Sequence, residues 1–155
     1  MGVAKNYDIL RYDDVLLMLA EAYIELGQHA NALPLINQIR ARAAASTGKL
    51  RKLDGTFASN YNMQQYPAAG WTQAYSRTAL QWERRLEFAT EGSRFFDLVR
   101  WGIAAQTLNA YIAVEKTRRT FLSTAVFTAG RDEYLPVPQS EITFTNGLYK
   151  QNPGY

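Results

Sequence analysis

Residues 11–27 read RYDDVLLMLAEAYIELG, and this stretch decides the fold. Its apolar side chains recur at spacings of three and four residues, which is the period of one face of an α-helix. Asp13 and Asp14 stand at the start, where acidic side chains favour the positive end of the helix dipole, and Gly27 ends the pattern. Apolar residues also occupy the far side, so we expect neighbours to cover this helix on more than one face.

A second apolar stripe follows Gly27, so we predict an antiparallel helical hairpin within residues 12–44. The small and large residues of the two stripes match the packing positions of a tetratricopeptide unit, in which small side chains let two helices approach closely. No second copy follows at the repeat's period of about 34 residues, so a regular array is not predicted. The matching positions are Leu16, Leu19, Ala20, Tyr23, Gly27, Ala32, Ile36 and Ile39.

Three further helices are expected after the hairpin. The first begins near Ala79 and runs to Glu91, the second follows Ser93 as its N-cap, and the third follows Gly102. Residues 120–155 contain three prolines that forbid regular helix, so we predict an irregular, extended tail there. The fold class is therefore all-α, with tetratricopeptide-like hairpins of the α-α superhelix type.

Composition excludes several classes of function. The 17 Lys and Arg residues against 14 acids give a net charge of only +3, and the bases are scattered, which does not fit a nucleic-acid partner. The chain has no cysteine, so it can build neither a disulfide nor a thiolate metal site. The single histidine, His29, reads as a solvated turn residue rather than a zinc ligand. No metal, cofactor or membrane-spanning helix is expected.

Three acids, Glu83, Glu87 and Glu91, are spaced four residues apart on a predicted helix. Such a row could form a carboxylate metal site or a hydrolytic acid pair. Arginines that are near in sequence favour a structural network of ion pairs instead, and no catalytic base or nucleophile is apparent. The predicted network comprises Glu83, Arg84, Arg85, Glu87, Glu91, Arg94, Asp97 and Arg100.

Residues 46–78 form a long loop in which aromatic residues alternate with neutral amides. Flat rings beside amides suit sugars, although the same rings could simply pin the loop to the domain. Trp71 follows Gly70 with no helical stripe to bury it, so we expect an exposed indole there, whereas helix packing explains Trp82 and Trp101. The candidate glycan contacts are Trp71, Tyr61, Tyr66 and Tyr75.

Three ordered blocks resemble the SusD/RagB family of surface glycan-binding lipoproteins. They are RYDDVLLMLAEAYIELG at 11–27, WERRLEFATEGSRFFDLVRWG at 82–102, and YLPVPQSEI with the terminal QNPGY. The resemblance implies a helical, tetratricopeptide-like fold and no enzymatic activity. It also implies a glycan receptor on the outer-membrane surface that forms a lid over a SusC-like TonB-dependent transporter.

Members of that family are several times longer and carry a lipidated N-terminal cysteine, which this chain lacks. We therefore interpret residues 1–155 as the C-terminal part of a longer protein, which would associate with the membrane only through that absent N-terminal lipid anchor. The fragment alone is expected to be soluble. The alternative function is a tetratricopeptide-like scaffold for protein–protein interaction, although one hairpin offers little binding groove.

Overall fold

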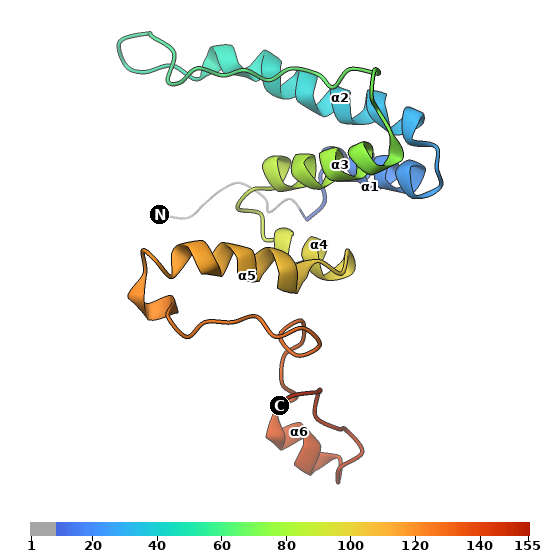
Figure 1. Ribbon diagram of the computed structural model, residues 1–155, viewed down its shortest axis with the longest axis vertical. Helices are drawn as coiled ribbons and strands as arrows, with labels where there is room; N and C mark the ends of the chain where they lie inside the picture. The colour runs from blue at the N-terminus through green and yellow to red at the C-terminus, as the bar shows by residue number, and fades with distance from the viewer. Residues whose placement is uncertain (1–8) are drawn as a thin grey trace. The chain divides into compact units, whose positions relative to one another are not determined.

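The computed structural model describes residues 9–155, which form two compact units with the boundary after Thr90. The first unit contains α1 (Tyr12–Glu25), α2 (His29–Ser46), the 3-10 helix η1 (Thr47–Lys49) and α3 (Gln73–Glu87) (Figure 1). The predicted hairpin of α1 and α2 is confirmed. Gly27 makes the turn between these helices with a φ of 76°, a left-handed conformation that favours glycine.

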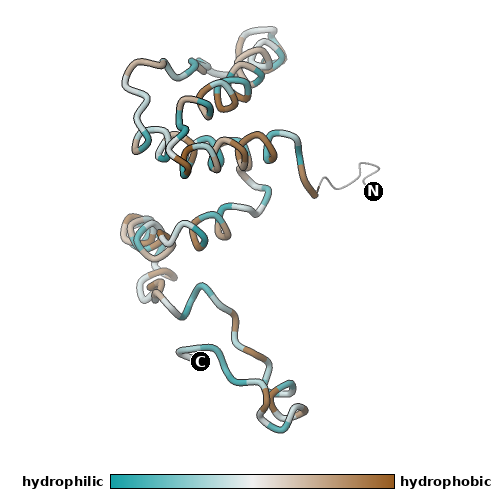
Figure 2. Tube along the Cα trace, turned by 90° about the vertical axis from the view of Figure 1, so that its right-hand side faces the viewer, coloured by the Kyte–Doolittle hydropathy of each residue, from teal (hydrophilic) through white to brown (hydrophobic). Residues whose placement is uncertain are grey.

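The core of the first unit lies where α1, α2 and α3 meet. Hydrophobic and hydrophilic residues alternate along the helical segments in Figure 2. The buried hydrophobic residues of these three helices pack together. Four partly buried residues, Tyr23, Leu33, Leu35 and Tyr66, pack against the core. The core consists of Leu16, Leu17, Ala20, Ile24, Ala32, Ile36, Ile39, Trp71, Ala79, Leu80 and Phe88.

The bounds of α3 differ from the prediction at both ends. The helix begins at Gln73 rather than near Ala79, because the Thr72 hydroxyl accepts a hydrogen bond from the Tyr75 backbone N–H and caps the first turn. It ends at Glu87 rather than Glu91, because Thr90 and Gly92 both take positive φ values that interrupt the helix. The long loop is accordingly shorter than predicted.

The second unit contains α4 (Arg94–Arg100), α5 (Ala104–Glu115), the 3-10 helix η2 (Thr120–Leu122) and α6 (Gln139–Phe144). Ser93 precedes α4 as expected, but its hydroxyl makes no capping hydrogen bond. The short helix α6 corrects the prediction of a wholly irregular tail. Pro138 lies immediately before α6, and proline is tolerated at a helix start because its missing N–H would have no partner there.

Amide side chains hold the extended segments of the second unit. The Gln151 side chain accepts a hydrogen bond from the Val137 N–H at 2.7 Å and donates one to the Val137 carbonyl at 3.0 Å. Asn109 bonds both backbone groups of Phe127 in the same way, at 2.8 Å each. The block YLPVPQSEI and the terminal QNPGY are therefore joined through hydrogen bonds to the backbone, which gives this pair of motifs a structural role.

Candidate functional site

The loop between η1 and α3 returns alongside α2 (Figure 1). The Asn37 side chain of α2 binds both backbone groups of Tyr66, donating to its carbonyl at 2.9 Å and accepting from its N–H at 2.8 Å. Arg40 donates from Nε to the Gln64 carbonyl. These bonds replace the backbone partners that an irregular segment lacks, so the loop is fixed to the helix.

Trp71 anchors the end of this loop in the core. Its side chain is 7% exposed, and its indole N–H donates to the His29 carbonyl at 2.8 Å. The ring centroids of Tyr66 and Tyr75 lie 5.4 and 5.5 Å from that of Trp71. The prediction of an exposed indole at Trp71 is wrong, because the loop closes over the hairpin and its largest side chain fills the space beneath it.

The three tyrosines proposed as glycan contacts lie in different surroundings. Tyr66 is half-buried, and its hydroxyl donates to Glu83 at 3.0 Å. Burial and the Glu83 carboxylate raise the pKa of Tyr66 from 10.0 to about 12. Tyr75 keeps 44% of its surface exposed, and Tyr61 is partly exposed. Tyr66 and Tyr75 join Trp71 in one aromatic cluster. Glycan contact by any of the three stays a prediction.

The acids of the predicted network pair with arginines from other parts of the fold. Glu83 and Glu87 do not pair with the arginines of their own helix. Glu83 forms an ion pair with Arg40 of α2, while Glu87 pairs with Arg11 at 2.8 Å and with Arg42 at 2.6 Å. The two carboxylates therefore tie α3 to the hairpin, and this correction follows from tertiary packing that local spacing does not reveal.

The other members of the predicted network also divide between helices. Glu91 lies beyond the end of α3, so it is not aligned with Glu83 and Glu87 on one helix face. In the second unit, the buried Asp97 pairs with Arg100 at 2.9 Å, one turn along α4. The guanidinium of Arg94 lies 5.8 Å from the ring centroid of Trp101. Within residues 9–155, no group of three or more His, Asp or Glu side chains could hold a metal ion.

Two of the three arginines of α3 form ion pairs with α1, and the third lies against an aromatic ring. Arg84 pairs with Asp14 of α1 at 2.7 Å, and Arg77 pairs with Glu25 of α1 at 2.7 Å. The hydrogen bonds from Arg77 lower the pKa of Glu25. Arg85 instead lies over the ring of Trp82, with 5.0 Å between its guanidinium carbon and the ring centroid.

Trp82 is the aromatic residue that sequence reasoning missed. Its side chain is 50% exposed, although its position within a predicted helix indicated packing. The spacing of the two residues in the sequence could have indicated this. Trp82 follows Tyr75 by seven residues, which is nearly two full turns, so both rings lie on one face of α3. Tyr75 being exposed, Trp82 is exposed as well.

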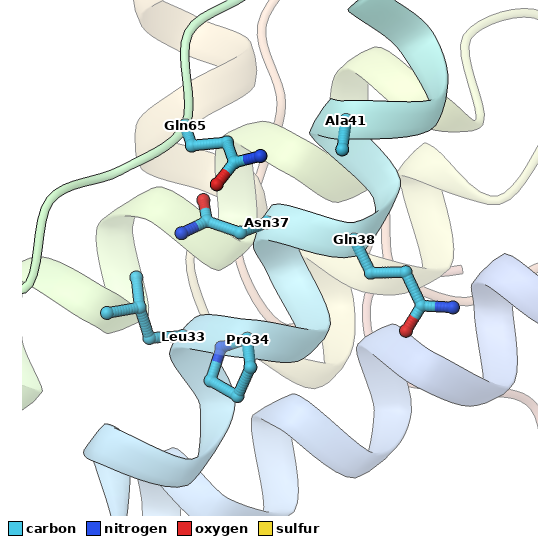
Figure 3. A pocket seen from close by; sticks show the side chains of 6 residues that line it. All are labelled: Leu33, Pro34, Asn37, Gln38, Ala41 and Gln65. Atoms are coloured by element: carbon cyan, nitrogen blue, oxygen red, sulfur yellow. The ribbon is translucent and has the colours of Figure 1, made fainter. Parts of the chain in front are cut away.

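A shallow groove of about 410 Å³ lies between α2 and the loop (Figure 3). It contains no charged side chain. Gln65 extends toward Asn37, whose amide is already bonded to the Tyr66 backbone, while Gln38 points away from both. The free polar groups of the groove are therefore the amides of Gln38 and Gln65. The lining residues are Leu33, Pro34, Asn37, Gln38, Ala41 and Gln65.

Comparison with known proteins decides the family. The model of the SusD family matches residues 1–155. The chain belongs to the SusD family. SusD-like protein P2 of Formosa agariphila is 28% identical over 151 residues, covering 97% of this chain and 26% of that protein. SusD-like protein P25 of the same organism is 36% identical over 98 residues, covering 63% of this chain and 16% of the relative.

A solved structure confirms the fold class. The crystal structure of a SusD homolog from Bacteroides thetaiotaomicron has a TM-score of 0.73 and 30% sequence identity to this SusD family chain. It covers 95% of this chain and 26% of the other. The all-α, tetratricopeptide-like prediction is thus confirmed, and the chain spans about a quarter of the length of these relatives. No helix within residues 9–155 is long and apolar enough to cross a membrane.

Proposed function

We propose that this chain is part of a non-catalytic receptor that binds glycans at the bacterial outer-membrane surface and delivers them to a SusC-like TonB-dependent transporter. The observation that carries the proposal is the family match over residues 1–155. The SusD-like relatives and the structural likeness to a SusD homolog support it. The longer protein is held at the cell surface by an N-terminal lipid anchor, and residues 1–155 form its C-terminal part.

The two carboxylates of α3 fit a binding role without catalysis. A general acid or a nucleophilic carboxylate must be free to reach a substrate. The two acids of α3, Glu83 and Glu87, are instead engaged with arginines from outside that helix. Their charges stabilise the unit and are not presented to a ligand.

Isolation from native outer membranes tests this function. The full-length protein, carrying an affinity tag, is purified in mild detergent and its bound proteins are identified by mass spectrometry. A TonB-dependent transporter in the purified complex, together with retention of the protein on immobilised polysaccharide, is the expected result. A protein that purifies without a transporter and binds no polysaccharide would contradict the proposal.

A second candidate function, a protein-interaction scaffold, is favoured by one observation on α1. The outer face of this helix carries exposed apolar residues at spacings of three and four, which is the pattern of a helix that packs against another helix. Such a face favours association of the isolated chain. Sedimentation should therefore show self-association, whereas a clean monomer with a high melting temperature would show that this face of α1 does not need a covering partner. The exposed apolar residues of α1 are Tyr12, Val15, Met18 and Leu19.

A further inference from the structure

The outer face of α3 presents two aromatic rings and a cation to solvent. Tyr75 is 44% exposed and Trp82 50% exposed, and Leu86 continues the same face one turn later. Seven residues separate the two rings along the helix, which corresponds to a rise of about 10.5 Å. That rise is close to the length of two pyranose rings in an extended polysaccharide, so one chain could contact both aromatic side chains.

Arg85 adds a positive charge to this face, and no acid within residues 9–155 forms an ion pair with it. Arg77 and Arg84 of the same helix each pair with an acid of α1. Arg85 forms no ion pair within residues 9–155, and its guanidinium lies 5.0 Å from the Trp82 ring centroid. A guanidinium held over an indole is oriented in advance, which reduces the entropy lost when it binds an anion.

No acid of α3 competes for Arg85. Glu83 and Glu87 are the acidic residues of this helix, and both pair with arginines from outside it: Glu83 with Arg40, and Glu87 with Arg11 and Arg42. An incoming anion would therefore meet the guanidinium without repulsion from a free carboxylate of the same helix. The arrangement is complementary to a ligand that carries a ring with apolar faces and a negative group.

We propose that Tyr75, Trp82 and Arg85 form a binding site for acidic saccharides, an inference that rests on the proposed glycan-binding function. The apolar C–H groups of one sugar ring contact the exposed part of the Trp82 indole, beside the guanidinium that lies over that ring. A carboxylate or sulfate on the sugar accepts hydrogen bonds from Arg85, whose planar fork fits either group. The polysaccharide then continues along the surface of α3 to Tyr75. The groove beside α2 has no charged side chain, so it would not select an acidic sugar.

A protein partner fits this face less well. Packing another helix on Trp82 and Leu86 would bury Arg85, and a buried charge without a partner is strongly unfavourable. An acidic saccharide supplies the missing negative group while leaving the outer side of the site in water.

Calorimetric titration of the 155-residue chain tests the site with three polymers. Polygalacturonate supplies carboxylates, carrageenan supplies sulfates, and an uncharged galactan supplies neither. We expect binding to one or both acidic polymers that weakens as salt increases, and weaker binding to the galactan. A preference between the first two polymers tells which anionic group the site takes.

Two arginine variants provide the matched control. Arg85→Gln and Arg77→Gln remove the same charge from the same helix, so non-specific attraction to a polyanion falls equally in both. Arg85→Gln should weaken acidic-polymer binding about tenfold or more beyond the change in Arg77→Gln, as expected for a hydrogen bond to a charged group. Trp82→Ala should weaken it by a similar factor, with the melting temperature nearly unchanged.

Three results would overturn the inference. The first is equal affinity of the two arginine variants, and the second is equal affinity of the chain for acidic and uncharged polymers. The third is loss of self-association in Trp82→Ala without loss of acidic-polymer binding, which would assign this face to a second copy of the chain. None of these depends on the transporter co-purification, so the proposed function is judged separately.

Discussion

The loop before α3 and the outer face of α3 are both aromatic, yet they use their rings in opposite ways. In the loop, the Trp71 indole is buried and its N–H is bonded to a backbone carbonyl, and the Tyr66 hydroxyl is bonded to Glu83. On α3, Trp82 is half exposed beside Arg85, which has no ion pair within residues 9–155. Polar atoms with internal partners mark aromatic residues that stabilise a fold, whereas a free ring face beside an unpaired charge marks a surface open to a ligand.

The largest effect should come from removing the loop anchor. Trp71→Ala leaves a cavity in the core and removes the indole bond to the His29 carbonyl, so we expect the free energy of unfolding to fall by about 3 to 5 kcal/mol. Trp71→Phe keeps an aromatic ring in the core but loses the N–H bond and part of the side-chain volume, so its cost should be smaller, about 1 to 2 kcal/mol. Urea denaturation of both variants measures these losses. If Trp71→Ala lost less unfolding free energy than Trp71→Phe, the anchor role would be contradicted.

A somewhat smaller effect is expected at the buried carboxylate of α3. Glu83→Gln removes the charge that neutralises Arg40 and weakens the acceptor of the Tyr66 hydroxyl, which should cost roughly 2 to 4 kcal/mol. Glu25→Gln is the matched control, because Glu25 pairs with Arg77 on the surface and should cost less than about 1 kcal/mol. Equal losses in the two variants, measured by chemical denaturation, would show that the Glu83 network is not stabilising.

The helical hairpin could be predicted because its causes are local. The apolar spacing of residues 12–44 and the glycine between the two stripes lie within the sequence that forms the element, and α1 and α2 follow them closely. The start of α3 was missed because one hydroxyl, that of Thr72, decides it. The helix α6 was missed because Pro138 was counted against helix, although a proline just before the first turn is compatible with one.

The candidate site could not be predicted in the same way, because burial depends on which element covers which. Trp71 and Trp82 exchange their expected exposures, since the loop folds onto the hairpin while one face of α3 stays uncovered. Glu83 and Glu87 were expected to pair with arginines that are near in sequence, but their partners come from α2 and from the residue preceding α1. Sequence spacing identifies neighbours along one helix and leaves contacts between helices open.

A smaller, pH-dependent effect should appear at Tyr66. Burial and Glu83 raise its pKa from 10.0 to about 12, so the folded state disfavours its ionised form. The stability that the neutral hydroxyl contributes is complete below pH 10 and is lost as the pH rises from 10 toward 12. Tyr66→Phe should therefore cost about 1 to 2 kcal/mol at neutral pH. The difference from the unmodified chain should shrink toward pH 12, and a constant difference across that range would contradict the assignment.

The most direct test of the contrast between loop and helix measures unfolding free energy and affinity for an acidic polysaccharide in Trp71→Phe and Trp82→Ala side by side. We predict that Trp71→Phe loses stability and keeps the affinity of the unmodified chain. Trp82→Ala should keep its stability and lose affinity by about tenfold or more, as expected for a tryptophan at the centre of a binding site. The opposite pattern, with affinity lost at Trp71 and only stability lost at Trp82, would contradict the account.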